Sequence, residues 1–329
     1  MKVKSLKIYE YGNPKEVIRV ENKTITLPTQ QEILVRMLAR PINPSDLIPI
    51  WGKYAHRITL PTVPGYEGVG IVEAVGPLVT PKLLGQRVLP LRGEGTWQEM
   101  VKTQAAFAVA IPTEMDNFTA AQMYINPLTV LVTCTEVLKL RSSDVLLVNA
   151  CGSAIGHLYA QFAKVLGFQL IAVTRNGLHT NALQQLGANY VIDTSHMPLY
   201  ETVMALTNGK GADAAIDSIG GDAGNQLAFC VKPGGNFLAI GLLSGVQVNW
   251  ATIVNEAKVQ ARMFHLRHWQ HQSTPEKWQQ FMQRLINLVY NGVLAMMSVN
   301  TCFPLLDIHK AIDAVESAHI NKGKVFLTT

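Results

Sequence analysis

A regular alternation of two sequence patterns begins near Thr119 and constrains the fold more than any other feature of the chain. Short apolar runs, typical of strands buried on both faces, alternate with segments whose apolar residues recur at helical spacing. The expected strands are Asp144–Ala150, Gln169–Thr174, Tyr190–Asp193, Ala212–Ser218 and Asn236–Gly241. The expected helices are Ile155–Leu166, Leu178–Leu186, Leu199–Thr207 and Asp222–Val231. This βαβ series predicts a parallel, doubly wound sheet.

The segments on either side of this series have a different character. Before it, short strand patterns are separated by glycine and proline, which predicts a small and partly closed β unit. Its expected strands are Glu32–Leu38, a strand pair or bend over Gly65–Gly76, Gly85–Leu91 and Trp97–Val101. After it, we expect a helix over Pro275–Asn291 and a final strand at Phe326–Leu327. The sequence thus predicts an α/β protein in which the βαβ domain, 119–268, is inserted into a mainly β domain formed by 1–118 and 269–329.

The composition excludes several classes of protein. The 329 residues are 48% hydrophobic and 16% charged, which suits a packed core and not a disordered chain. No apolar run reaches the roughly 18 residues that span a bilayer, and the net charge of +5 is not gathered into a basic cluster, so we expect neither a membrane nor a nucleic acid as a partner. Four scattered cysteines without a CxxC pair argue against a disulfide scaffold, and the N-terminus lacks the apolar core of a signal peptide. We therefore expect a cytoplasmic protein.

The stretch Val145–Gly156 places small residues between an apolar strand and the start of a helix. Small residues let the backbone approach a pyrophosphate, and the first turn of a helix offers free N–H groups to it. A tight turn without a ligand would select the same residues. The βαβ series around this stretch favours the dinucleotide site.

The end of the second expected strand indicates which dinucleotide is bound. NAD enzymes usually carry Asp or Glu there, which accepts a hydrogen bond from the ribose 2′-hydroxyl. This chain instead has Thr174, Arg175 and Asn176, with no acid. Because a guanidinium pairs well with phosphate oxygens, these residues favour the 2′-phosphate of NADPH. The alternative is that Arg175 is a solvated loop arginine.

Together these patterns resemble the medium-chain dehydrogenase/reductase superfamily, in which a Rossmann domain is inserted into a GroES-like catalytic domain. Zinc-dependent members carry Cys and His where this chain has Asn43 and Tyr66, and their four-cysteine lobe is missing here. Since zinc needs Cys, His or carboxylate ligands, the resemblance implies a zinc-free reductase without a metal site. His265, His268 and His271 are spaced by three, but they lie on a polar stretch that is more typical of a surface than of a metal site.

Within that superfamily, the chain looks like the mitochondrial-type 2-enoyl thioester reductases over nearly its whole length. The distinguishing features are Gly95-Thr-Trp97, Asn126-Pro-Leu-Thr129, Ser153 and the segment from Arg262 through Trp269 to Pro275. Asn43-Pro-Ser-Asp46 followed by Gly52-Lys-Tyr54 also fits, although quinone reductases share a similar pattern. Three segments depart from the thioester reductases. His265 replaces a Trp, Arg175-Asn176-Gly177 replaces Arg-Asp-Arg and so lacks one phosphate-binding arginine, and Ile240-Gly241-Leu242 replaces an aromatic residue followed by two glycines.

The resemblance also implies roles for individual residues. It places the catalytic tyrosine at Tyr54, whose hydroxyl can donate to the developing enolate, with water as the alternative proton source. Including Thr174 from the strand-end argument, the expected cofactor contacts are Asn126, Gly152, Ser153, Ala154, Ile155, Thr174, Arg175, Asn176, Gly241, Phe264, His265 and Lys324. A simple N-cap at Asn126 and a solvated Lys324 are the structural alternatives.

The expected activity is zinc-independent, NADPH-dependent addition of hydride to an activated C=C bond, with a 2-enoyl thioester as the substrate. Coenzyme A and an acyl carrier protein are both open as the acyl carrier. The nearer alternative is an NADPH:quinone or alkenal reductase, and the farther one is a non-enzymatic NADPH-binding protein. We also expect a homodimer, because the resemblance implies one and because Asn236–Gly241 with Val246–Trp250 suggests an apolar sheet edge that needs covering.

Overall fold

The computed structural model describes residues 2–53, 55, 58–317 and 323–329, so the expected catalytic Tyr54 lies outside the described residues. The chain divides into two compact units. We call Asn126–Gln272 with Asn291–Ala295 the parallel-sheet unit, and Met1–Ile125 with Ser273–Tyr290 and Met296–Thr329 the β-rich unit. Each unit is therefore built from segments that are far apart in the sequence.

The parallel-sheet unit is built on six strands that pair in the order β10-β9-β8-β11-β12-β13, with every pair parallel. The strands are β8 (Val145–Val148), β9 (Gln169–Thr174), β10 (Tyr190–Asp193), β11 (Ala212–Asp217), β12 (Val231–Ala239) and β13 (Gln260–Met263). The order along the sheet reverses between β8 and β11, as in a doubly wound dinucleotide-binding fold. The predicted parallel sheet is confirmed.

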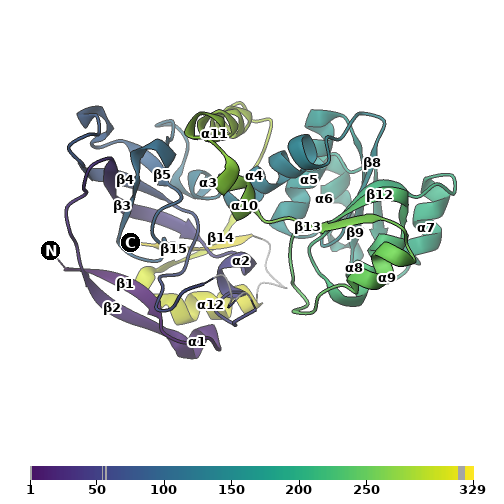
Figure 1. Ribbon diagram of the computed structural model, residues 1–329, viewed down its shortest axis with the longest axis horizontal. Helices are drawn as coiled ribbons and strands as arrows, with labels where there is room; N and C mark the ends of the chain where they lie inside the picture. The colour runs from purple at the N-terminus through teal and green to yellow at the C-terminus, as the bar shows by residue number, and fades with distance from the viewer. Residues whose placement is uncertain (1, 54, 56–57, 318–322) are drawn as a thin grey trace. The chain divides into compact units, whose positions relative to one another are not determined.

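Helices cover both faces of this sheet in two groups (Figure 1). One group is α5 (Ala154–Leu166) with α6 (Thr180–Leu186), and the other is α7 (Leu199–Leu206), α8 (Gly221–Phe229) and α9 (Trp250–Asn255). Leu146 and Leu147, neighbours on β8, are both fully buried, because each points into a different helix layer. This double burial explains why the strands are apolar without alternation.

The sheet edge differs from the predicted one. The expected edge strand Asn236–Gly241 belongs to β12, which has β13 on its outer side, and Val246–Trp250 is a loop that runs into α9. The strand Gln260–Met263 is not predicted from the sequence, because its polar and apolar residues alternate and most of them are exposed. The outermost strand of this side is thus β13.

The β-rich unit contains a β1–β2 hairpin and a seven-stranded sheet in the order β14-β15-β3-β4-β5-β7, with β6 paired to β3. The strands are β1 (Lys2–Ile8), β2 (Ile18–Thr24), β3 (Glu32–Pro41), β4 (Val69–Val75), β5 (Arg87–Pro90), β6 (Met100–Gln104), β7 (Ala108–Ala110), β14 (Val299–Pro304) and β15 (Lys324–Thr328). The expected strand pair or bend over Gly65–Gly76 is the single strand β4, preceded by an extended loop in which Gly65 has a φ of +93°. Among the described strand pairs of this unit, β14 and β15 pair in parallel and the others are antiparallel.

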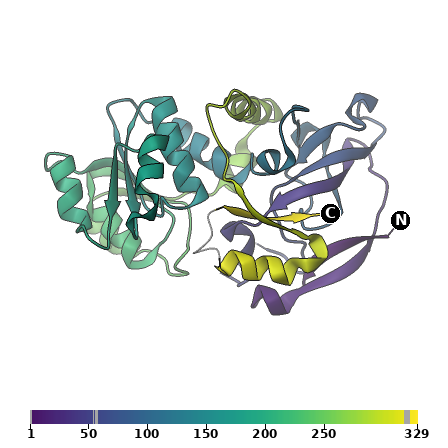
Figure 2. The ribbon, with the colours of Figure 1, turned by 180° about the vertical axis from the view of Figure 1, so that it is seen from behind.

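Helix α12 packs on β14 and β15 at one side of this sheet, as Figure 2 shows. The helices of the unit are α1 (Pro14–Val17), α2 (Pro44–Leu47), α3 (Asn117–Ala121), α11 (Pro275–Tyr290) and α12 (Ile308–Ser317). Two further helices are α4 (Ile125–Val132), which begins at the boundary between the units, and α10 (Leu266–Gln272). The expected helical stripe on α11 is present, with Trp278, Met282 and Leu285 fully buried.

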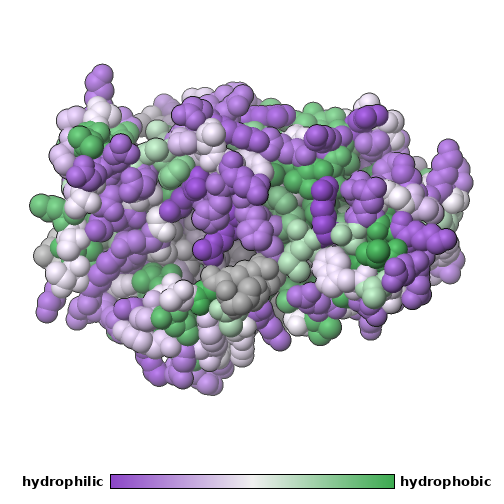
Figure 3. Space-filling model, in the orientation of Figure 1, coloured by the Kyte–Doolittle hydropathy of each residue, from purple (hydrophilic) through white to green (hydrophobic). Residues whose placement is uncertain are grey.

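Hydrophilic residues cover most of the face drawn in Figure 3, and apolar residues form separate patches between them. In the described part of the chain, no helix combines the length and apolar character needed to cross a membrane.

Candidate functional site

The turn between β8 and α5 brings backbone atoms unusually close together. Ser153 caps α5 by accepting a hydrogen bond from Gly156 N at 3.4 Å, and Cys151 N donates to Val173 O of β9 at 3.1 Å. A Cβ placed on Gly156 would lie 2.3 Å from Cys151 Cα, so only glycine fits there. The turn therefore presents backbone and the first N–H groups of α5, as a pyrophosphate site requires.

A buried polar cluster lies where the order of the sheet reverses. Asn149 Nδ2 donates to Asp217 Oδ1 at 2.6 Å, and Ser218 N donates to Asn149 Oδ1 at 2.8 Å. Ser218 Oγ is buried and has no hydrogen-bond partner among the described residues. A Cβ on Gly241 would lie 2.7 Å from Ser218 O, so Gly241 closes over this cluster.

Sequence reasoning missed Asn149, Asp217 and Ser218. The available signal was that polar residues directly follow the apolar strands β8 and β11, on either side of the point where the strand order reverses. Ligands of doubly wound sheets bind in the crevice at this point, outside the carboxyl ends of the strands. The unpartnered Ser218 hydroxyl is consistent with a polar ligand there.

In the loop after β9, two polar side chains bond to the loop's own backbone and a third is exposed. Thr174 Oγ1 donates to Asn176 O at 2.9 Å, and the Asn176 side chain accepts from Leu178 N at 3.2 Å. Both side chains thus shape the loop, while Arg175 is exposed. Of the three residues expected to hold a 2′-phosphate, Arg175 carries the positive charge. Thr174 and Asn176 hold the backbone of the loop on which Arg175 lies.

The remaining expected cofactor residues of the parallel-sheet unit follow the same edge of the sheet. Phe264 N donates to Ala239 O at 2.8 Å, which places Phe264 and His265 beside the carboxyl end of β12. Asn126 is half-buried in the first turn of α4. Because all six strands are parallel, the residues at or just after their carboxyl ends share one edge of the sheet. The expected cofactor residues on this edge are Gly152, Ser153, Ala154, Ile155, Thr174, Arg175, Asn176, Gly241, Phe264 and His265. This edge has the glycine turn, the helix start and the arginine that a phosphorylated dinucleotide needs.

Lys324, also expected near the cofactor, is buried in the β-rich unit instead of lying in solvent. Its Nζ donates to Asn43 Oδ1, and Asn43 Nδ2 donates to Glu67 Oε1 at 2.7 Å. Asp46 accepts from Asn43 N at 2.7 Å and from Tyr66 N at 3.1 Å. The four side chains of Asn43, Asp46, Glu67 and Lys324 form what we call the buried charge cluster.

Burial dominates the electrostatics of this cluster. It raises the pKa of Asp46 from 3.8 to about 7, against the opposing effect of the Asn43 N–H. It also raises the pKa of Glu67, although Lys324 and the N–H groups of Ile125 and Tyr124 oppose it. The same burial lowers the pKa of Lys324, while both carboxylates favour its charged form.

A zinc ion does not fit the donor set at Asn43 and Tyr66. The Asn43 amide already donates to Glu67 and accepts from Lys324, and the Lys324 ammonium supplies a positive charge beside it. Across residues 2–53, 55, 58–317 and 323–329, no three His, Cys, Asp or Glu side chains are grouped to hold a metal ion.

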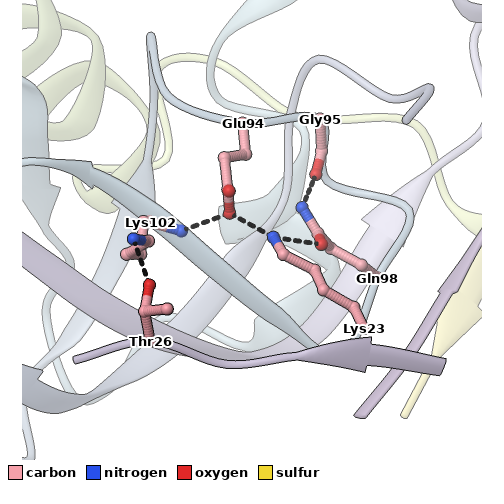
Figure 4. A network of polar contacts seen from close by, with 6 residues as sticks. All are labelled: Lys23, Thr26, Glu94, Gly95, Gln98 and Lys102. Carbon is pink, nitrogen blue, oxygen red and sulfur yellow. Dashed lines mark hydrogen bonds and ion pairs between the residues drawn. The ribbon is translucent and has the colours of Figure 1, made fainter. Parts of the chain in front are cut away.

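The loop Gly95–Gln98 is held from two sides. Lys23 Nζ donates to Glu94 Oε2 at 2.8 Å and to Gln98 Oε1 at 2.9 Å, and Lys102 N donates to Glu94 Oε2 at 2.9 Å (Figure 4). On the other side, Thr96 Oγ1 donates to Glu67 O at 2.9 Å. The Gly95-Thr-Trp97 segment is thus tied directly to the backbone of the buried charge cluster.

Two family models match this chain in succession. The alcohol dehydrogenase GroES-like domain matches residues 29–113, and the zinc-binding dehydrogenase family matches residues 154–287. Among curated proteins, the rat mitochondrial enoyl-[acyl-carrier-protein] reductase is 30% identical over 322 residues, which cover 95% of this chain and 85% of the rat protein.

Solved structures similar to this chain include proteins named as quinone reductases. A Bacillus thuringiensis protein, provisionally named an NADPH:quinone reductase, has a TM-score of 0.98 and 63% identity, covering 100% of this chain and 99% of that one. The Escherichia coli quinone oxidoreductase complexed with NADPH has a TM-score of 0.89 and 25% identity, covering 99% and 100%. The predicted relationship is confirmed: the chain belongs to the medium-chain dehydrogenase/reductase superfamily and is an NAD(P)H-dependent oxidoreductase of the quinone or enoyl reductase type.

Proposed function

We propose that this protein is an NADPH-dependent reductase that transfers hydride to a quinone. The observation that carries the proposal is the 63% identity, over the whole chain, to the protein named as an NADPH:quinone reductase. The enoyl reductase relatives reach 30%. The comparisons therefore favour the quinone acceptor, the alternative in the sequence interpretation, over the enoyl thioester.

The cofactor residues that support NADPH lie along the carboxyl edge of the parallel sheet. Bound NADPH would supply hydride from its nicotinamide ring. The start of α5 with its Ser153 cap offers N–H groups to the pyrophosphate, and Arg175 offers a guanidinium to the 2′-phosphate. The Ser218 hydroxyl, at the point where the strand order reverses, offers a hydrogen bond to the nicotinamide riboside, and Gly241 packs against the Ser218 backbone beside it. Asn126, Phe264 and His265 are proposed to complete this end of the site.

An enoyl thioester remains the second candidate acceptor. It is favoured by the identity to the rat enoyl reductase along 95% of this chain, and by the Gly95-Thr-Trp97 and Asn126-Pro-Leu-Thr129 segments. The two acceptors differ in their need for a proton. An enoyl product must take a proton on carbon, whereas the oxygens of a reduced quinone take protons readily from water.

Tyr54→Phe separates these two candidates, since it removes only the hydroxyl. Oxidation of NADPH is followed with 1,4-benzoquinone and, separately, with crotonyl-CoA, for the natural protein and the variant. A donor to a developing oxyanion is worth about 10²–10³ in kcat. We expect rapid quinone turnover that changes little in the variant. Turnover of the thioester alone, with a loss of that size in the variant, would favour the enoyl reductase.

A further inference from the structure

The loop that carries Arg175 also carries an imidazole that reaches the glycine turn. His179 lies just before α6, and a Cβ placed on Gly152 would be 2.6 Å from its Cδ2 and 3.0 Å from its Nε2. The imidazole edge of His179 is therefore in contact with the backbone of the turn between β8 and α5. His179 and Arg175 therefore belong to one short loop beside the turn that is proposed to hold the cofactor phosphates.

A second imidazole lies behind the first. The rings of His157, on α5, and His179 have centroids 5.7 Å apart and planes at 70°. His157 Nε2 is buried and has no hydrogen-bond partner within the part of the chain that the structure describes. Burial, followed by the neighbouring His179, lowers the pKa of His157. Two such close imidazoles disfavour a double positive charge, so His157 stays neutral when His179 is protonated.

Arg175 and Asp193 are charged groups of this loop and of the strand beside it. Arg175 contributes the one arginine of the loop, because Gly177 follows where related thioester reductases carry a second arginine. On β10, Asp193 faces the loop, since a Cβ on Gly177 would lie 3.4 Å from its Oδ2. The Asp193 carboxylate accepts from Ser195 N and Oγ, and its neighbour His196 is exposed. The Cys151 thiol of the turn is neutral, because burial raises its pKa to about 12.

We propose that protonated His179 is the second cationic ligand of the 2′-phosphate of NADPH, and that this makes the preference for NADPH over NADH depend on pH. The inference rests on the proposed function only for the identity of the cofactor. An anionic phosphate beside an imidazole favours its protonated form, so NADPH binding is accompanied by uptake of a proton at His179. NADH, which lacks this phosphate, binds without proton uptake.

The sign of the pH dependence follows from this proton uptake. Raising the pH removes the proton from His179, so NADPH binding weakens and NADH binding does not. Protonation of a phosphate monoester near pH 6 would act in the opposite direction, so the test runs above that value. A hydrogen bond to a charged group corresponds to about a tenfold or larger change in affinity.

The test measures the dissociation constants of NADPH and NADH for the full-length protein at pH 6.5 and pH 8.5, by nicotinamide fluorescence. We expect the NADPH constant to rise about tenfold over this range in the natural protein, with NADH nearly unchanged. His179→Gln should bind NADPH weakly at both pH values, whereas His179→Lys should bind it tightly at both. His309→Gln, an exposed histidine on α12, is the control and should behave as the natural protein.

Proton uptake provides a readout that needs no variant. Calorimetric titrations in two buffers of different ionisation enthalpy should show uptake of a proton with NADPH and none with NADH. Equal pH dependence for both nucleotides, or absence of uptake, would overturn the role of His179 and leave the proposed NADPH-dependent activity intact. Equal affinity for NADPH and NADH at pH 6.5 would instead contradict the cofactor assignment itself.

Discussion

At the scale of single residues, the burial of Lys324 rules out the solvated alternative to its expected role. A lysine near a chain end is usually solvated, and its sequence neighbours gave no sign of burial. The structure places it against Asn43, with two buried carboxyl groups nearby. Removing one partner from such a buried cluster leaves an uncompensated charge, so a substitution at any one of these residues destabilises the fold. Their interdependence joins β15 to the segment around α2, which no local pattern could reveal.

Other site residues could be predicted because their roles are local. Ser153 caps the helix that follows it, and Arg175 follows a strand whose end was recognisable. Asn149 and Asp217 were missed because their hydrogen bond joins strands 68 residues apart in the sequence. The same holds for His157 and His179, which sequence spacing does not place together.

Asp46 provides a prediction about pH. Its pKa is about 7 in the folded protein against 3.8 ordinarily, so between these values the folded state binds more protons than the unfolded state. The free energy of unfolding should therefore fall as pH rises through this interval, by about 2–4 kcal/mol. Urea denaturation between pH 5 and pH 8 should show a shallower fall for Asp46→Asn. An unchanged slope would contradict the raised pKa. Asp222→Asn, exposed at the start of α8, should retain the natural slope.

Arg175 provides a prediction about cofactor choice. Its exposed guanidinium is proposed to pair with the 2′-phosphate, so Arg175→Ala should weaken NADPH binding by about tenfold or more and leave NADH binding nearly unchanged. Titrations of both nucleotides at one pH and one salt concentration measure the difference. If both nucleotides weaken equally, Arg175 does not recognise the 2′-phosphate.

At the scale of elements, strands buried on both faces were predictable and exposed strands were not. β9, which is buried along nearly its whole length, begins and ends at the predicted residues. β13 and β14 have mixed sequences, because much of each strand is exposed and pairing with a neighbour, not burial, defines it. Their existence follows from tertiary pairing that a local pattern does not encode.

The turn before α5 provides a prediction about stability. A Cβ on Gly156 would lie 2.3 Å from Cys151 Cα and 2.5 Å from Cys151 O, and backbone cannot move aside cheaply. Gly156→Ala should lower the free energy of unfolding by about 2–4 kcal/mol, despite the better helix propensity of alanine. At Gly177 the nearest atom would be 3.4 Å away, so Gly177→Ala serves as the matched control and should be nearly neutral. Equal stability of both variants in urea would show that the turn tolerates a side chain.

At the scale of the whole molecule, the sequence indicated an insertion because the strand–helix rhythm starts and stops within the chain. The contact units show segments from both ends of the chain joining in the β-rich unit, with β15 paired to β3. What the rhythm could not show is where β14 and α12 pack, since neither belongs to the βαβ series.

The homodimer remains a prediction for the whole molecule. The outer strand β13 leaves one side of its backbone without a strand partner among the described residues, and exposed edges of this kind tend to be covered. Light scattering at micromolar concentration should give twice the 36.1 kDa mass of the chain. A mass equal to that of one chain would contradict the dimer.

The central claim, an NADPH-dependent reductase with a quinone acceptor, is tested most directly by competition. 1,4-Benzoquinone and crotonyl-CoA are mixed at equal concentration with limiting NADPH and a catalytic amount of the protein, and hydroquinone and butyryl-CoA are quantified against a protein-free control. The product ratio then equals the ratio of the two kcat/KM values. We predict hydroquinone in at least about tenfold excess, which corresponds to roughly 1.4 kcal/mol between the two transition states. Butyryl-CoA as the main product would contradict the claim.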